Sequence, residues 1–191
     1  MTRISDAIKT DHRQIEACYD KIINSNDPDE QTRWQNQFTW ELARHSIGEE
    51  LVVYPAFETH LPEGKDMANK DRQEHQVVKE LLKQFQEMKS SDPKFMSTIR
   101  TLMDNLSPHI KEEEEQDLVR LEGALDQAES ERMATSFGRT KMFVPSRSHP
   151  SAPNKPPFET AVGLLTAPID HIADIFRKFP DHSISPNPST K

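Results

Sequence analysis

Apolar positions recur at intervals of three and four residues along most of this chain, which is the spacing of one face of an α-helix. The first predicted helix covers residues 5–23, and its repeating face is made of Ile8, His12, Ile15, Tyr19 and Ile22. Three more helices are predicted over residues 32–58, over 66–89 and from 94 onward. No segment alternates between apolar and polar residues as a half-buried strand does. The pattern therefore indicates an all-α protein.

Proline and glycine mark the predicted limits of these helices. Residues 61–64, Leu-Pro-Glu-Gly, separate the second helix from the third, and a loop is expected over residues 24–30. Pro55 is expected to bend or end the second helix near its C-terminus. Pro108 falls inside the fourth pattern, so we expect either a kink there or a helix that begins later. A further helical stretch over residues 118–135 should extend or follow the fourth helix.

The character of the chain changes after Lys141, where five prolines fall between positions 145 and 157. Such a composition is typical of a semi-rigid spacer. The chain is therefore expected to divide into a four-helix bundle with a trailing helix over 1–141, a Pro-rich linker over 142–157, one or two short amphipathic helical segments over 158–180 and a flexible tail over 181–191. A break is expected near Pro168. Residues 158–179 should pack back on the bundle, self-associate or bind a protein partner.

Composition narrows the class of protein. The 191 residues suffice for one domain with a buried core and an appendage. The net charge of −8, with no basic stripe, argues against a nucleic-acid partner. No apolar run approaches the ~18 residues of a membrane span, and no apolar stretch near the N-terminus could serve as a secretory signal. The single cysteine, Cys18, excludes an intrachain disulfide. We therefore expect a cytoplasmic protein.

A repeat of histidine and glutamate runs through the predicted helices. Its first copy consists of His12, His45 and Glu49, and its second copy consists of His75, His109 and Glu113. The two histidines are 33 residues apart in the first copy and 34 apart in the second, and each glutamate follows its histidine by four. Because residues four apart share a helix face, the repeat predicts one helical hairpin used twice. It can direct four imidazoles and two carboxylates inward.

Such polar side chains are costly to bury unless a metal or another partner satisfies them, and bundle interiors are an established place for metal sites. A lone buried histidine is usually a core residue, whereas four on core faces are hard to explain by packing. Four imidazoles, two bridging carboxylates and a shared oxo or hydroxo group would give each of two metals five ligands and one vacancy. Mixed nitrogen and oxygen donors suit iron, and also manganese or another divalent metal. Structural zinc is disfavoured because it prefers a closed tetrahedral set.

These elements resemble the hemerythrin-like proteins of the HHE cation-binding family. The resemblance rests, over about residues 4–122, on Asp11-His12, His45-Ser-Ile-Gly-Glu49, Glu74-His75 and His109-Ile-Lys-Glu-Glu113. It implies an up-down-up-down four-helix bundle around an oxo- or hydroxo-bridged non-haem di-iron centre. It also implies that the four histidines are terminal ligands, that Glu49 and Glu113 bridge the metals, and that dioxygen or a related small molecule binds between iron and an apolar pocket.

One residue departs from the family's oxygen carriers, which have a second histidine one turn after the first on the third helix. This chain has Lys79 there, and a protonated ammonium cannot ligate iron, whereas a deprotonated lysine could. The site therefore resembles the four-histidine, two-glutamate centres of di-iron repair and iron-sensing relatives. Glu16 or Glu112 could add a fifth ligand, although a solvated carboxylate is more typical of such charge-dense stretches. Tyr19 and Tyr54 could hydrogen-bond near the site and orient the imidazoles.

Three functions remain open at this point. The first is a di-iron protein that binds dioxygen or nitric oxide, or that senses or buffers iron. The second is a di-iron oxidoreductase that acts on peroxide or nitric oxide. The third is a helical interaction scaffold whose C-terminal segment recruits a partner.

Overall fold

The computed structural model describes the backbone of this chain except at residues 1, 155–157, 182–186 and 189–191, and the side chains except at these residues and 158–165. The described part is helical and contains no strand. Its elements in chain order are α1 (Ile4–Asn24), α2 (Pro28–Gly48), the π-helical turn η1 (Glu49–Val53), α3 (Tyr54–His60), α4 (Gly64–Glu87), α5 (Phe95–Glu112), the π-helical turn η2 (Glu113–Asp117), α6 (Leu118–Ala124), α7 (Gln127–Phe143) and α8 (Phe158–Asp174).

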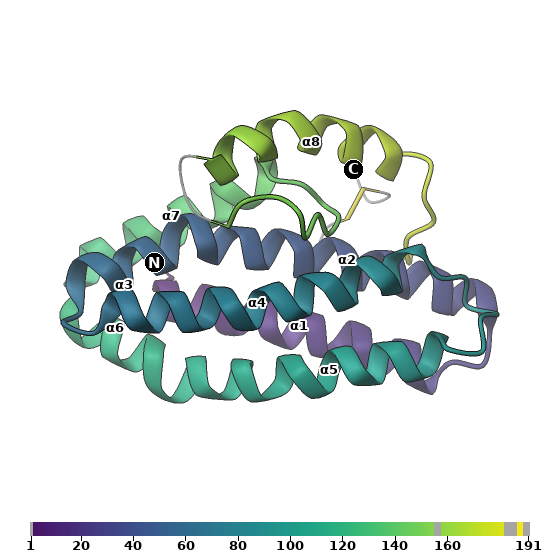
Figure 1. The fold of residues 1–191 in the computed structure, drawn as a ribbon, viewed down its shortest axis with the longest axis horizontal. Coiled ribbons are helices and arrows are strands. Elements are labelled where there is room, and N and C mark those ends of the chain that lie inside the picture. Colours follow the sequence, from purple (N-terminus) through teal and green to yellow (C-terminus); the bar gives the residue numbers. More distant parts are fainter. Residues whose placement is uncertain (1, 155–157, 182–186, 189–191) are drawn as a thin grey trace.

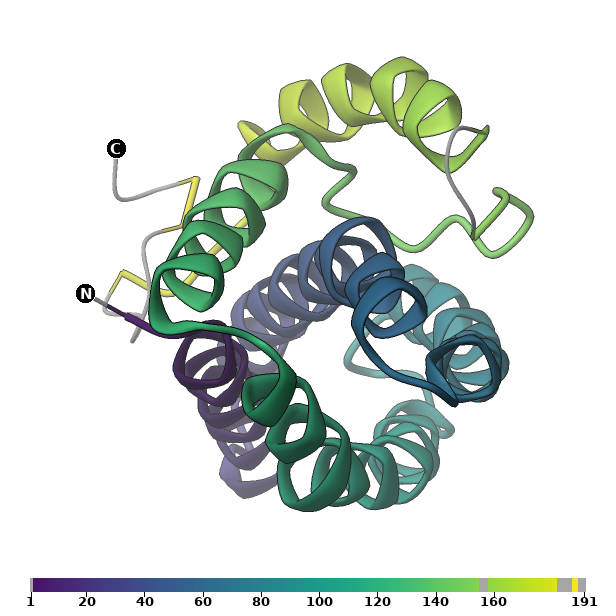
Figure 2. The same cartoon turned by 90° about the vertical axis from the view of Figure 1, so that its left-hand side faces the viewer.

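Four long helical runs lie side by side and alternate in direction: α1, α2 with η1 and α3, α4, and α5 with η2 and α6 (Figure 1). Each run contacts the next, and α5 contacts α1. The four therefore close into a ring around a common interior, which Figure 2 shows nearly along the bundle axis. The expected up-down-up-down bundle is confirmed. None of the described helices is both long and apolar enough to cross a membrane.

The buried apolar residues form two clusters at different heights in the bundle. One cluster contains Ile15, Phe38, Leu82 and Ile99 among others. The second contains residues such as Ile8, Val53, Phe57 and Leu118. The repeated histidines and glutamates lie between these clusters along each helix, as His12 does between Ile8 and Ile15. The hydrophobic core is thus divided by a polar layer.

The second helix differs from its prediction at both ends. It begins at Pro28 because the Asp27 side chain caps it by accepting a hydrogen bond from the Asp29 N–H, so the loop expected over 24–30 is shorter. At the other end the helical path does not stop at Pro55 and continues to His60. The preceding residue, Tyr54, donates its N–H to the carbonyl five residues back, and the missing donor of proline falls beside this widened turn.

The other two helix predictions also need correction. Pro108 lies inside α5, which begins at Phe95, so the alternative of a later start is wrong. The stretch expected over 118–135 is broken after Ala124, because Asp126 and Glu129 form a capping box that starts a new helix. This new helix, α7, packs against α1 and α2 on the outside of the bundle (Figure 2).

Residues 144–154 form an irregular strap over the outer side of α2 and α4. Ser148 exchanges main-chain hydrogen bonds with the Gln86 side chain, and Arg147 donates to Asn36. The strap also holds α8, because the Ser146 hydroxyl donates to Asp174. Residues 142 and 143, expected in the linker, belong to α7, and the strap that follows them is attached to the bundle at several points.

The helix α8 continues through Pro168, so the break expected there is wrong. Its last turns are tied down by the strap: His149 contacts Asp170, and His171 contacts the carbonyl of Val144. A row of large apolar side chains on and after α8 faces solvent: Ile169, Ile172, Ile175 and Phe176. The side chains expected on the apolar face before residue 166, and most of the tail expected over 181–191, lie outside the described residues.

The start of α4 requires glycine. A Cβ atom on Gly64 would lie 1.7 Å from the carbonyl oxygen of Phe57, whereas a Cβ on Gly138, in the middle of α7, would meet nothing within 4 Å. We expect Gly64→Ala to lower the free energy of unfolding by about 2 kcal/mol or more through this backbone clash. The control Gly138→Ala should raise it by up to about 1 kcal/mol through helix propensity. Urea unfolding of both variants measures the difference, and equal stabilities would contradict the tight turn.

Candidate metal centre

The structure brings the six side chains of the repeat together from four helical runs. They are His12 on α1, His45 on α2, Glu49 at the start of η1, His75 on α4, His109 on α5 and Glu113 at the start of η2. None of these residues is more than 4% exposed. In α2 with η1, and again in α5 with η2, the glutamate follows its histidine by four residues, which places both side chains on the same inward face. The sequence predicts this arrangement.

Glu49 lies between two pairs of histidines. Its Oε1 atom is 3.1 Å from His45 Nε2 and 4.0 Å from His12 Nε2. Its Oε2 atom is 3.4 Å from His75 Nε2, which in turn is 3.1 Å from His109 Nε2. Each pair of histidines forms, with this one carboxylate, a group whose ligand atoms lie within 4.8 Å of one another. The geometry therefore offers two adjacent metal positions that share Glu49.

The two halves of the centre are nearly symmetric. The rings of His12 and His45 have centroids 4.8 Å apart and an interplanar angle of 69°, and the rings of His75 and His109 have the same distance and angle. Glu113 Oε2 lies 3.3 Å from His12 Nε2. The doubled hairpin in the sequence is thus a doubled arrangement in space.

The chemistry of the donor atoms fits a bound cation. Among the described residues, no hydrogen-bond partner is found for His12 Nε2 or for either carboxylate oxygen of Glu49 and Glu113, although all five atoms are buried. Buried polar atoms in folded proteins are nearly always satisfied, and an unpaired buried carboxylate is costly. Metal ions held among these oxygens and the Nε2 atoms would satisfy them.

A carboxylate holds the Nδ1 atom of every histidine in the centre. The distances are 2.8 Å from His12 to Glu114, 3.3 Å from His45 to Asp11, 3.2 Å from His75 to Glu50 and 2.9 Å from His109 to Glu74. With the proton on Nδ1 donated to these acids, each Nε2 is left free to bind metal. Asp11 and Glu74 precede a histidine of the repeat, and Glu50 and Glu114 follow its glutamates. None of these four acids was predicted from the sequence to hold an imidazole, since Asp11 and Glu74 entered only as part of the family motif.

The π-helical turns explain how one glutamate can face the centre while the next glutamate in the chain holds an imidazole. A π turn holds more residues than an α turn, so consecutive side chains point in more similar directions. Glu49 therefore faces the centre while Glu50 reaches His75, and both carboxylates are fully buried. Glu113 and Glu114 repeat this arrangement at η2.

A cation stands behind each of these four carboxylates. Arg13 pairs with Glu114, Lys141 with Asp11, Lys79 with Glu50 at 2.5 Å, and Lys70 with Glu74 at 3.6 Å. Lys141 comes from α7, so the helix outside the bundle also supports the centre. Lys79, which stands where oxygen carriers have a further histidine, is engaged with Glu50. The negative charge of the outer carboxylates is thereby compensated.

The comparisons with known proteins agree with this arrangement. Residues 3–121 match the family model of the hemerythrin HHE cation binding domain. The chain belongs to the hemerythrin HHE family. An uncharacterized hemerythrin-like protein of Schizosaccharomyces pombe is 59% identical over 181 residues, which cover 94% of this chain and 89% of that protein. The family resemblance predicted from the sequence is therefore confirmed, and the histidine and glutamate clusters can bind metal cations.

A second relative of the chain is more distant in sequence. A DNA nickase of Nostoc sp. is 28% identical over 144 residues, which cover 75% of this chain and 40% of the nickase. No solved structure matches the chain.

The charges around the centre shift the pKa values of its histidines in different directions. Burial lowers the pKa of His45, but the charges of Glu49 and Asp11 outweigh it and raise the pKa to about 10. Burial is likewise outweighed at His109, where Glu74 and the neighbouring carboxylates raise the pKa to about 9. At His75 burial dominates and lowers the pKa. Burial is outweighed at His12 too, where Glu113 and Glu114 raise the pKa. Without metal, at least His45 and His109 are therefore protonated at neutral pH.

Tyr54 is the buried tyrosine beside the centre. Its hydroxyl lies 3.0 Å from His75 Nε2, and burial together with the charge of Glu49 raises its pKa well above the usual value. The hydroxyl therefore stays protonated. Tyr19 instead packs, partly buried, against the larger apolar cluster. Of the two tyrosines considered from the sequence, Tyr54 is the one that hydrogen-bonds at the centre.

Glu16 and Glu112 lie at the rim of the bundle. Glu16 pairs with Arg13 at 3.1 Å and Glu112 pairs with Lys70. Their side chains are 34% and 40% exposed. These contacts favour the solvated state over a fifth ligand.

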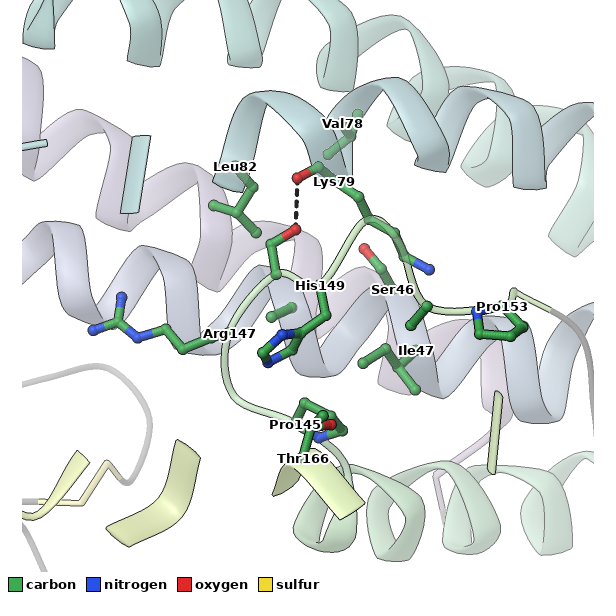
Figure 3. A pocket seen from close by; sticks show the side chains of 13 residues that line it. Ser46, Ile47, Val78, Lys79, Leu82, Pro145, Arg147, His149, Pro153 and Thr166 are labelled. Carbon is green, nitrogen blue, oxygen red and sulfur yellow. Dashed lines mark hydrogen bonds between the residues drawn. The ribbon is translucent and has the colours of Figure 1, made fainter. Parts of the chain in front are cut away.

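A pocket lies next to the centre on the outer side of the bundle. Figure 3 shows it where the strap crosses α2 and α4, with Ser46 and Ile47 on one wall and Lys79 on another. The Ser148 hydroxyl donates to the Lys79 carbonyl at 2.5 Å. Lys79 therefore lines this pocket, and its ammonium also pairs with Glu50, which holds His75 of the centre.

Metal binding to the metal-free protein should release protons. His45 and His109 are protonated at pH 7 in that state, and each must lose a proton before Nε2 can act as a ligand. About two protons or more should therefore be released per chain, because the pKa of His12 is raised as well. Affinity should therefore rise as the pH increases from 7 to 10. Calorimetric titration of Co²⁺ in buffers of different ionisation enthalpy measures the number of protons. A value near zero would contradict the charged imidazoles.

Proposed function

We propose that this protein holds two iron ions at its four-histidine, two-glutamate centre, where it binds dioxygen or nitric oxide or senses or buffers iron. The observation that carries the proposal is the position of Glu49, whose two oxygens face different histidine pairs. A shared carboxylate is the means by which a protein holds two metal ions close together. Mixed nitrogen and oxygen donors suit iron, with manganese or another divalent metal as the alternative occupant.

The residues divide the work of holding the metals. His12 and His45 would bind one ion and His75 and His109 the other, with Glu49 and Glu113 as bridges. When bound, the pair of ions would supply redox chemistry and an open position for a small ligand. The carboxylates at the Nδ1 atoms keep the imidazoles oriented. The apolar clusters on both sides keep bulk water from the layer.

The pair of Lys79 and Glu50 supports a sensor or a redox protein rather than a dedicated oxygen carrier. Because this lysine is an ammonium held at 2.5 Å by Glu50, the protein offers one imidazole fewer than an oxygen carrier does. Both ions would then be reachable by exogenous ligands.

A di-iron oxidoreductase acting on peroxide or nitric oxide is the second candidate. The observation that favours it is the protonated hydroxyl of Tyr54, which lies 3.0 Å from His75 Nε2 and can donate a hydrogen bond into the centre. Assays of iron-loaded protein with a reductant separate the two functions. Sustained turnover of peroxide or nitric oxide favours the enzyme, and stoichiometric binding favours the carrier or sensor.

We do not extend the name of the DNA nickase to this chain. The match covers 40% of that protein, and a net charge of −8 is unfavourable for an approach to phosphates. The exposed row of Ile169, Ile172, Ile175 and Phe176 favours instead a protein partner or self-association as an additional role.

The iron content of purified protein tests the proposal directly. We expect about two iron atoms per chain, together with ligand-to-iron charge-transfer absorption in the optical spectrum. Chelation should lower the melting temperature, because binding to the native state adds to the free energy of unfolding. Elemental analysis, the spectrum and a thermal scan can be made on one preparation. Manganese in place of iron would change the proposed redox role, and an absence of metal would contradict the centre.

The two glutamates can be tested against a matched neighbour. Glu49→Ala or Glu113→Ala should remove a bridge and most of the bound metal. Glu115→Ala removes an exposed carboxylate of the same π turn as Glu113 and should retain the metal. Metal content after identical loading measures the effect. Equal occupancy in all three variants would show that the carboxylates have been assigned wrongly.

A further inference from the structure

Comparison of the two halves of the centre shows where the repeat stops being symmetric. The positions four residues before the first histidine and four after the glutamate are Ile8 and Val53 in the first half, both fully buried in an apolar cluster. The corresponding positions of the second half are Asp71 and Asp117, which are 2% and 7% exposed. Apolar side chains satisfy packing at this level in the first half. Packing alone therefore does not account for the acids in the second.

Asp71 is the more deeply buried of these acids, and it lies against the outer side of the centre. Ligand atoms of Asp71, Glu74 and His109 lie within 4.8 Å of one another. The Oδ2 atom of Asp71 is buried and has no hydrogen-bond partner in the described part of the chain. Burial, together with the negative charges of Asp117, Glu113 and Glu74, raises the pKa of Asp71 to about 8, although His109 and Lys70 act on it as positive charges. A divalent cation bound beside Asp71, outside the centre, would compensate this concentration of negative charge.

Carboxylates also connect this cluster to the surface. Glu74 and Glu112 are 35% and 40% exposed at the rim, where Lys70 pairs with both. Lys70 is itself 47% exposed, so its flexible side chain can leave them. From this rim, Asp71 and Asp117 lead to Glu113 of the centre, whose charge acts on both of them. Acidic side chains therefore extend from solvent to a bridging position.

We propose that Asp71, Glu74 and Asp117, together with His109, form a loading site for a divalent cation on its way to the centre. The route to the centre rests on the proposed function, whereas the cation site itself does not. Carboxylate oxygens with one imidazole suit Fe²⁺ and other divalent cations of its size. A row of predominantly acidic side chains raises the local concentration of a cation and the rate of its association. The first half has the apolar pair Ile8 and Val53 at these positions instead.

The rate of metal uptake tests the loading site. Asp71→Asn and Asp117→Asn each replace a carboxyl group that can bind a cation by an amide of nearly the same shape. Glu115→Gln makes the matched change on the solvent side of the same π turn. Stopped-flow mixing of metal-free protein with Fe²⁺ in the absence of oxygen, followed by a chelator quench, measures the rate. We expect both asparagine variants to load at least about tenfold more slowly, with the same final iron content. Glu115→Gln should load like the unmodified protein.

The outcomes separate the loading site from the function on which it rests. If all the variants load at the same rate and to two irons, the loading site is wrong and the di-iron centre stands. If the unmodified protein takes up no iron, the proposed function fails, and the cluster is then tested by equilibrium titration with Co²⁺. Loss of a bound Co²⁺ in Asp71→Asn, but not in Glu115→Gln, supports the cation site. Equal binding in both overturns it, and circular dichroism of each variant shows that the comparison is between folded proteins.

Discussion

The structure depends on one layer of ionisable side chains that divides an otherwise apolar core. Burial of unpaired charges costs several kcal/mol each, so the layer is stable only if every member is compensated. The compensation is ordered: Glu49 and Glu113 face the Nε2 atoms, four outer carboxylates hold the Nδ1 atoms, and four cations neutralise the outer carboxylates. The centre itself keeps polar atoms that no described residue satisfies. These unsatisfied polar atoms are the physical reason for expecting bound metal.

The requirement explains features that packing alone does not. An α-helix points consecutive side chains about 100° apart, which would direct Glu50 and Glu114 away from the histidines. The π turns η1 and η2 bring each of them close enough to hold an imidazole. The helix α7 is drawn into the same system, because it supplies Lys141 behind Asp11. Its ring of Phe137 also packs against His45, with centroids 6.0 Å apart.

Much of this could be predicted from the sequence, for identifiable reasons. The interval between His45 and Glu49 reports a shared helix face, so the inward direction of the repeat follows from periodicity alone. The start of α7 could also have been predicted, since Asp126 and Glu129 have the spacing of a capping box. The helical pattern on both sides of this box, however, favours one uninterrupted helix. The π turns were not readable, because the same residues would also suit an ordinary helix. The pairing of Lys79 with Glu50 depends on contacts between helices that no local pattern reports.

The symmetry of the ligands makes the asymmetry of their surroundings informative. The two pairs of histidines have the same spacing and angle, yet only the half with His75 and His109 is flanked by Tyr54, Lys79, Asp71 and Asp117. The equivalent positions in the other half are Leu118, Glu16, Ile8 and Val53. Two ions in such a site would have similar ligands and different environments, because three of these four positions are apolar beside one ion, whereas those beside the other hold a proton donor, an ammonium and two acids. We therefore expect an exogenous ligand to react at one ion in preference to the other, because a symmetric set of protein ligands alone would not distinguish the two ions.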